Sequence, residues 1–424
     1  MIGDFEHSGP RRLARRVNRT LVGLLVSSFA AGAFSALNAQ EQVPRDAAAA
    51  MQAPAKAGDA RLLPLPSNWT DRLKVNGDVR IRGEYTEKED DPSRERMRLR
   101  ARLWLDAMIS DNLKAVIGLA TGDGDPASSN QTMDDAFSRK PIRLDLAYID
   151  WRPGFAPGLA LDAGKMRNPC LVVDDLIWDT DVTPEGLALG YKRGFGPVEL
   201  IANAMAFWVD ERHKVMEKMD GGAAQSTDAD TLLYTGQLGF KYKPCDTAHV
   251  LVAGSYYHYQ NMAGYQTLCD GTMSYGNSTV SPGGSADKYY LYEYRIWEGM
   301  AELGLTCPLT GLPVRLYGNF VKNADPDSDN AGFMAGIRFN NASEANTFAV
   351  DYNYSRLEKD AVVGAFTDRD RWGGGTDGQG HKVRGTYMLA KNLALDVTVF
   401  LDESAISGEG KSFRRYQADL TAKF

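Results

Sequence analysis

The chain of 424 residues is poor in several features that would assign it to a familiar class. Its 48 basic residues are outnumbered by 55 acidic ones, which argues against a nucleic-acid-binding protein. The longest uncharged, mainly apolar run, residues 21–37, is shorter than the roughly 20 residues of a membrane-spanning helix, so a helical membrane protein is excluded. No two of the five histidines have a helical metal-ligand spacing. Because Val, Leu, Ile, Tyr and Phe recur throughout the chain, collagen-like and disordered classes are excluded as well.

Residues 1–39 have the pattern of an export signal. Five arginines within residues 11–19 precede the apolar run, and the small-residue stretch 35–39 follows it. A charged segment followed by an apolar run and then by small residues is typical of a secretory signal peptide. The alternative is a membrane anchor that the mature protein keeps. We expect cleavage after Ala39, which removes five arginines and two acidic residues and changes the formal charge from −7 to −10. Residues 40–72, with several prolines and an alanine run, are interpreted as a periplasmic tether.

From residue 73 onward, apolar and polar residues alternate, which places them on opposite faces of a strand. Residues 73–85 alternate without exception, and the pattern returns at 96–109 and 416–424. Strands of this length can cross a bilayer, since tilted transmembrane strands need about 9–11 residues. The pattern predicts strands at 73–86, 96–109, 113–121, 142–152, 159–167, 186–193, 197–209, 231–243, 248–260, 289–306, 312–323, 331–340, 347–358, 380–389, 393–402 and 411–424.

The connections between these sixteen strands alternate between two kinds. Short turns rich in Gly, Pro, Asn and Asp alternate with longer loops such as 122–141, 210–230, 261–288 and 359–379. This arrangement predicts an all-β fold, a transmembrane antiparallel β-barrel with short periplasmic turns and long extracellular loops. A closed sheet leaves no unpaired edge in lipid, and its polar interior accounts for a mean hydropathy of −0.35. A secreted β-sandwich is the soluble alternative, although its strands average only about five or six residues.

Several segments, taken as a set, resemble the bacterial putative porin family. They are WTDRLKVNGDVRIRGEY at 69–85, ATGDGDP at 120–126 with SNQT at 129–132, GKMRNP at 164–169, LIWDTDVTPEG at 176–186 and DAVVGAFTD at 360–368. The resemblance covers residues 68–424 and implies an outer-membrane barrel (domain 73–424) that forms a diffusion channel without catalytic residues. Cys170 departs from the pattern, because a bulky aromatic residue is expected there.

The inward face of the first two predicted strands is rich in arginine. Antiparallel pairing is expected to place these side chains next to one another as a cationic ladder. Because guanidinium groups do not deprotonate, acids or hydrated anions must balance them. The arginines are Arg80, Arg82, Arg96, Arg98, Arg100 and Arg102.

The loop 167–185 after the fifth strand is acidic, and by resemblance to large porins it folds into the barrel. An arginine wall facing this loop would form a constriction with a transverse field that orients dipolar solutes. Alternatively, the loop is a solvated surface and the arginines balance Asp78, Glu84, Asp106 and lipopolysaccharide. The acidic residues are Asp174, Asp175, Asp179, Asp181 and Glu185.

Three smaller features complete the pattern. His258, within the aromatic run 256–259, is interpreted as part of an aromatic girdle. The acidic stretch 325–330 could bind Ca²⁺ in an extracellular loop, but it lacks the spaced glutamate of a helix-loop-helix site. The cysteines predict one disulfide on each face of the membrane: Cys245 with Cys307 in periplasmic turns, and Cys170 with Cys269 in extracellular loops.

The sequence therefore predicts a non-enzymatic outer-membrane porin for passive diffusion of small hydrophilic or charged solutes. Its expected partners are outer-membrane lipid and lipopolysaccharide, and a homotrimer is expected by analogy with barrels of this size. One alternative is a phospholipase-like barrel hydrolase, but no Ser and His occupy adjacent outward positions. Another is a structural envelope anchor, for which residues 40–72 are too short and irregular.

Overall fold

The computed structural model describes residues 69–211, 216–220, 223–227 and 229–424. The predicted signal peptide, 1–39, and all but the end of the predicted tether, 40–72, lie outside the described residues. The last residues of that tether, Trp69–Arg72, form a short 3-10 helix before the first strand. No helix in the described part of the chain is both long and apolar enough to cross a membrane.

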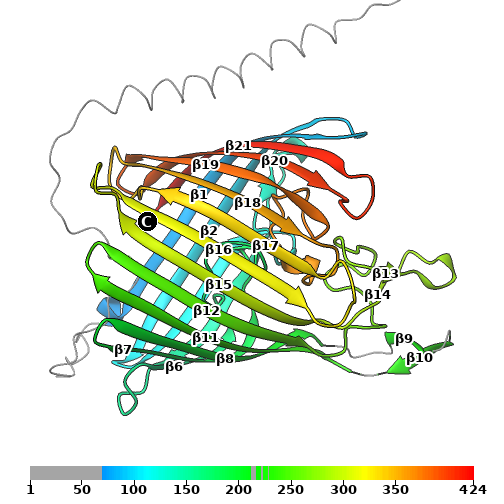
Figure 1. The fold of residues 1–424 in the computed structure, drawn as a ribbon, viewed down its shortest axis with the longest axis horizontal. Helices are drawn as coiled ribbons and strands as arrows, with labels where there is room; N and C mark the ends of the chain where they lie inside the picture. The colour runs from blue at the N-terminus through cyan, green and yellow to red at the C-terminus, as the bar shows by residue number, and fades with distance from the viewer. Residues whose placement is uncertain (1–68, 212–215, 221–222, 228) are drawn as a thin grey trace, which may run out of the picture. The chain divides into compact units, whose positions relative to one another are not determined.

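Sixteen long strands form one closed antiparallel barrel (Figure 1). Each strand pairs with the next one along the chain, and β21 pairs with β1 to close the sheet. The barrel strands are β1 (Leu73–Lys88), β2 (Arg94–Ser110), β3 (Leu113–Thr121), β5 (Ile142–Trp151), β6 (Leu159–Lys165), β7 (Glu185–Phe195), β8 (Val198–Asp210), β11 (Thr231–Cys245), β12 (Ala248–Tyr259), β15 (Arg295–Thr306), β16 (Pro313–Asn323), β17 (Ala331–Phe339), β18 (Phe348–Leu357), β19 (Gly378–Ala390), β20 (Leu393–Ser404) and β21 (Lys411–Lys423).

The predicted strands are all present, and their ends differ from the observed ones by two residues at most, with one exception. The strand predicted to begin at 289 is β15, which begins at Arg295. Tyr289–Tyr290 instead form β14, which pairs with β13 (Thr279–Val280) inside a loop. Two further short ladders involve loop residues: β4 (Gln131–Thr132) pairs with β2 and so joins the barrel sheet, and β9 (Met216–Asp220) pairs with β10 (Ala223–Thr227) in a separate sheet.

The two ends of the barrel differ (Figure 1). Short turns join the strands at one end, where Phe424 pairs through its backbone with Gly77. Long loops join them at the other end, and four of these concern the site: L2 (122–141), L3 (166–184), L5 (260–294) and L7 (358–377). The outer surface is an apolar belt in which side chains such as Leu103 and Val252 are 46% and 53% exposed. On this surface Tyr256 stacks on His258 and contacts Trp297, as expected for an aromatic girdle.

The interior of the barrel has two different sides, whereas alternation predicts a polar lumen throughout. On the side of β8 and β11 to β18, inward-facing apolar side chains form a core with Trp178 of L3 and Val362 of L7. These inward residues are Met205, Phe207, Leu233, Tyr257, Ile296, Met300, Val321, Met334 and Leu357, each at most 5% exposed. On the side of β1, β2, β20 and β21, the buried inward residues are mostly charged or polar. The lumen that alternation predicts to be polar is therefore filled in part by an apolar core.

Candidate functional site

A ladder of charged side chains lies on the inner wall formed by β1 and β2. Strand register sets it, because residues of even number on both strands face inward. Arg80 lies opposite Arg100, and Arg82 lies opposite Arg98. Acidic residues occupy the rungs on either side: Asp78 lies opposite Arg102, and Glu84 lies opposite Arg96. All six arginines predicted from the alternation are therefore on one face of adjacent strands.

Most of these arginines are neutralised by acids of the barrel wall. Asp78 accepts hydrogen bonds from Arg100 at 3.1 Å and from Arg102 at 2.8 Å. Glu84 accepts one from Arg96 at 2.6 Å. Arg82 reaches across the closing seam and holds Asp419 of β21 with two hydrogen bonds, of 2.7 and 2.8 Å. Such bidentate pairs fix orientation as well as charge.

L3 starts and ends at a pair of facing glycines. Gly164 of β6 and Gly186 of β7 are direct cross-strand partners, with φ of +125° and +150°. A Cβ on Gly164 would lie 2.2 Å from the carbonyl oxygen of Ala147, and one on Gly186 would lie 2.2 Å from that of Ala206. Only glycine fits a backbone of this shape at such close approach. The two glycines let the chain turn away from the wall where L3 begins and where it ends.

L3 runs across the lumen, since its acids contact inward side chains on two separate parts of the wall. Asp181 lies 3.5 Å from Arg100 and 3.3 Å from Arg102, and it also accepts a 2.8 Å hydrogen bond from Ser129 of L2. Across the barrel, Asp174 accepts a hydrogen bond from Asn353 of β18 at 3.1 Å, and Asp175 lies 2.5 Å from Lys382 of β19. Of the predicted acidic set, Asp181 is therefore the residue that meets the arginine ladder.

The other two predicted acids of this loop have different surroundings. Glu185 is the first residue of β7, where its exposed side chain pairs with Lys165 at 3.0 Å. Asp179 is turned toward L7 and accepts a hydrogen bond from the backbone N–H of Arg369 at 3.3 Å. Burial, followed by the charges of Asp368 and Asp181, raises the pKa of Asp179 well above its usual value. The raised pKa favours the neutral form of this carboxyl group, which can be buried where L3 packs against L7.

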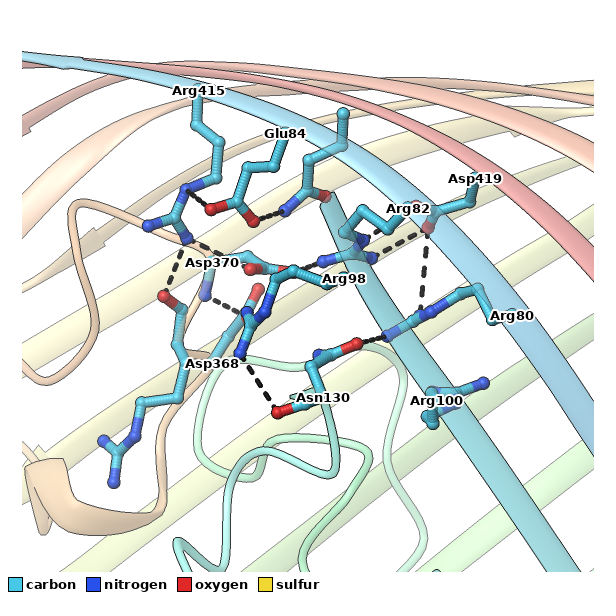
Figure 2. Close-up of polar contacts among 12 residues, drawn as sticks. Arg80, Arg82, Glu84, Arg98, Arg100, Asn130, Asp368, Asp370, Arg415 and Asp419 are labelled. Atoms are coloured by element: carbon cyan, nitrogen blue, oxygen red, sulfur yellow. Dashed lines mark hydrogen bonds and ion pairs between the residues drawn. The ribbon is translucent and has the colours of Figure 1, made fainter. Parts of the chain in front are cut away.

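L7 is a part of the site that the sequence analysis missed. Its residue Asp370 lies between Arg82 of β1 and Arg415 of β21, at 2.7 and 3.0 Å (Figure 2). The next residue, Arg371, is only 2% exposed and contacts Asp402 and Asn353. The sequence did contain a signal that this loop is buried, because three consecutive apolar residues, 361–363, are unusual in a loop exposed to solvent. Those residues are at most 2% exposed within the core shared with L3.

L2 supplies a third contact with the ladder. Asn130 accepts a hydrogen bond from Arg80 through its side-chain oxygen at 2.6 Å and one from Arg98 through its backbone oxygen at 3.3 Å (Figure 2). The residues that follow it form β4, which pairs with β2 at Leu99 and Arg98 and so fixes L2 against the wall. Three loops thus meet the wall of arginines from inside the barrel.

Three adjoining cavities remain in the lumen around L3. A cavity of about 730 Å³ is lined by L2, L3 and L5, and it shares Asp181 and Thr183 with a second one of about 380 Å³ along L3. The second cavity shares Asp174 with a third, of about 80 Å³. The charged side chains that line this third cavity are Asp174, Arg315, Arg338, Asp351, Lys382 and Arg384. Charged groups therefore follow the cavities from the loop end inward.

The four cysteines are free, so neither predicted disulfide is formed in the structure. Cys245 ends β11 and Cys307 follows β15, with β12 between these strands. Two strand spacings amount to about 9.5 Å, beyond the roughly 7 Å between Cα atoms that a disulfide tolerates. Cys170 is buried in the lumen, 3.6 Å from the sulfur of Met205, whereas Cys269 is exposed in L5. Cys170 thus takes the place of the expected aromatic residue within a packed contact.

The acidic stretch considered for Ca²⁺ has other partners. Asp325 pairs with Arg295 at 2.5 Å and accepts a hydrogen bond from the backbone N–H of Glu293 at 3.0 Å. Within the described ranges, no group of three or more His, Cys, Asp or Glu side chains converges in a way that could hold a metal ion.

Comparisons with known proteins agree with this architecture. The family model described as "Putative porin" matches residues 84–282 and 315–424. No curated protein sequence matches the chain. Among solved structures, Pseudomonas putida OprB at high pH is similar at 13% identity and a TM-score of 0.53, over 83% of this chain and 94% of that one. Salmonella typhi OmpF in complex with daunomycin is similar at 13% identity and a TM-score of 0.47, over 83% of this chain and 97% of that one. A triple mutant of the Rhodopseudomonas blastica porin is similar at 9% identity and a TM-score of 0.43, over 83% of this chain and 100% of that one.

Proposed function

Because this chain belongs to the putative porin family and folds as a closed sixteen-stranded antiparallel barrel, we propose that it is an outer-membrane channel for passive diffusion of small hydrophilic or charged solutes. The observation that carries this proposal is the asymmetric lumen. An apolar core fills part of the lumen, and adjoining cavities with charged groups in their lining remain beside it along L3. We propose no enzymatic activity.

The proposed constriction lies where L3 meets the arginine ladder. Asp181 faces Arg100 and Arg102, so a solute that passes along L3 is exposed to opposite charges on its two sides. Such a transverse field favours small dipolar or charged solutes over apolar ones, and it acts strongly because few screening ions fit in a narrow lumen. The loop acids Asp174 and Asp175 would continue the polar path along the other wall.

The apolar belt supports the proposed location in the outer membrane, with lipid and lipopolysaccharide around the barrel. From strand number alone we also propose a homotrimer, which native mass spectrometry in mild detergent would detect. His381 and His249 hydrogen bond to Tyr352 and Glu302, respectively, and not to a serine, which offers no support for the hydrolase alternative.

Conductance in a planar lipid bilayer tests the proposal. Stable open steps after insertion of the refolded barrel are expected, and their absence would contradict a channel. Arg102→Ala should reduce the preference for anions, since it removes one side of the field. Arg94→Ala is the matched control, because Arg94 is exposed at the loop end of the same strand. If both variants keep the wild-type ion selectivity, the proposed constriction at Arg102 is wrong, even if the barrel conducts.

A further inference from the structure

The seam where β21 closes on β1 has more arginines than acids. Seven arginines gather there, and the acids within 4.0 Å of them number five. The arginines are Arg80, Arg82, Arg96, Arg98, Arg100, Arg102 and Arg415, and the acids are Asp78, Glu84, Asp181, Asp370 and Asp419. A surplus of two positive charges in a poorly solvated place is costly unless a counter-ion is available.

The surplus is localised on Arg80 and Arg98. The nearest carboxylate oxygen to Arg80 belongs to Asp419, at 3.8 Å, and both oxygens of that carboxylate already accept hydrogen bonds from Arg82. Among the described residues, Arg98 forms no ion pair within 4.0 Å, whereas Arg82, Arg96, Arg100, Arg102 and Arg415 each do. The Nε atoms of Arg80 and Arg98 are both buried and have no hydrogen-bond partner within the described chain.

These two guanidinium groups are held close together by geometry. Arg80 and Arg98 are diagonal neighbours on paired strands, because their direct partners are Arg100 and Arg82. Asn130 accepts a hydrogen bond from each, and β4 fixes Asn130 in place (Figure 2). Arg80 keeps 13% of its side chain exposed toward the lumen. The arrangement is a preorganised pair of guanidinium groups whose Nε atoms lack an acceptor among the described residues.

We propose that Arg80 and Arg98, positioned by Asn130, form a binding site for a small oxyanion, a phosphate, sulfate or carboxylate group of a solute in the channel. Planar guanidinium groups match such groups with paired hydrogen bonds, which lysine does not reproduce. The site deepens the proposed function and rests on it, since it makes oxyanionic solutes the favoured cargo. It lies beside the contact of L3 with Arg100, so a bound anion would be held next to the constriction.

Isothermal titration of the folded barrel in detergent, with inorganic phosphate and separately with acetate, tests the site without requiring a channel. We expect saturable binding of at least one of the two anions. In the double variant Arg80→Ala/Arg98→Ala, the affinity for the anion should fall about tenfold or more. A tenfold fall corresponds to the loss of one charge-assisted hydrogen bond. Arg94→Ala should bind as wild type does. The choice between phosphate and acetate identifies tetrahedral or planar groups as the preferred ligand.

If the alanine variant fails to fold, the conservative variant Arg80→Lys/Arg98→Lys replaces it, because lysine keeps the positive charge. It should also weaken binding, because the paired geometry is lost. In a bilayer, the same anion should reduce the chloride current of wild type in a saturable way at constant ionic strength, and less so in the lysine variant. Absence of binding by both anions, or equal affinity in wild type and lysine variant, would overturn the site. The channel proposal fails separately, through absence of conductance.

Discussion

Asp370, in L7, is bound by two arginines from the two strands that close the barrel: its carboxylate lies 2.7 Å from Arg82 of β1 and 3.0 Å from Arg415 of β21. Although burial alone would raise the pKa of Asp370, these arginines hold it well below its usual range. Arg82 is held in turn by Asp419. The contact therefore connects a loop to the closing seam of the barrel.

Asp370→Asn should loosen L7. The substitution keeps the size of the side chain but removes its charge, so two buried arginines lose a counter-ion. We expect larger single-channel conductance or more frequent current fluctuations than in wild type, measured in planar bilayers at fixed salt. Asp327→Asn, an exposed residue of the loop 324–330, is the control. Identical traces for wild type and Asp370→Asn would mean that L7 does not restrict the path.

The contact between L3 and L7 should depend on pH. Burial, then the charges of Asp175 and Asp370, raise the pKa of Asp368 to about 7, and the neighbouring Lys382 opposes this rise. Because a raised carboxyl pKa means that the folded state binds a proton more tightly than the unfolded state, the contact is most stable in acid and weakens as pH rises through about 7. Conductance should therefore increase between pH 6 and pH 8.

In Asp368→Asn this increase should be smaller, since the side chain stays neutral at every pH. Bilayer recordings across that pH range, on wild type and variant at one salt concentration, make the comparison. The conductance of the variant should still depend weakly on pH, because Asp179 lies next to L7 and its pKa is raised as well. An unchanged conductance of wild type from pH 6 to pH 8 would contradict this account.

The barrel could be predicted from the sequence because lipid imposes a strict rule on every strand. A period of two with apolar residues outward is repeated sixteen times, and even the ladder from Arg80 to Arg102 follows from it. The beginning of β15 was predicted wrongly because Tyr289 and Tyr290 continue the aromatic pattern although they pair within L5. Local periodicity does not distinguish a barrel strand from a short ladder in a loop.

The loop contacts could not be predicted in the same way. Arg82 is 337 residues from Asp419 and 288 from Asp370, and no local pattern links residues at such separations. The apolar half of the lumen was overlooked for a related reason. Pairs such as Leu232 and Leu233 are apolar on both faces of a strand, which indicates that a loop covers the inner face.

The cysteines should differ sharply in reactivity. Burial raises the pKa of the Cys170 thiol to about 12, so it is both shielded and protonated at neutral pH, whereas Cys245 and Cys269 are exposed. We expect a maleimide to modify Cys245 fastest in the folded barrel, Cys269 more slowly because burial raises the pKa of its thiol to about 11, and Cys170 only after denaturation, as read by mass spectrometry of peptides. Detection of a Cys245–Cys307 or Cys170–Cys269 peptide without reduction would contradict the free thiols.

The glycines at the root of L3 should be intolerant of any side chain. In Gly164→Ala the new Cβ would meet the carbonyl oxygen of Ala147 at 2.2 Å on a backbone with φ of +125°, and the conformation alone costs about 1–3 kcal/mol. The midpoint of urea unfolding in detergent should fall, and L3 should lose its fixed entry into the lumen. Gly154→Ala is the matched control, because open space surrounds that position. If both variants unfold at the same urea concentration, the close approach at Gly164 is relieved by movement of the strand, and L3 does not depend on this glycine.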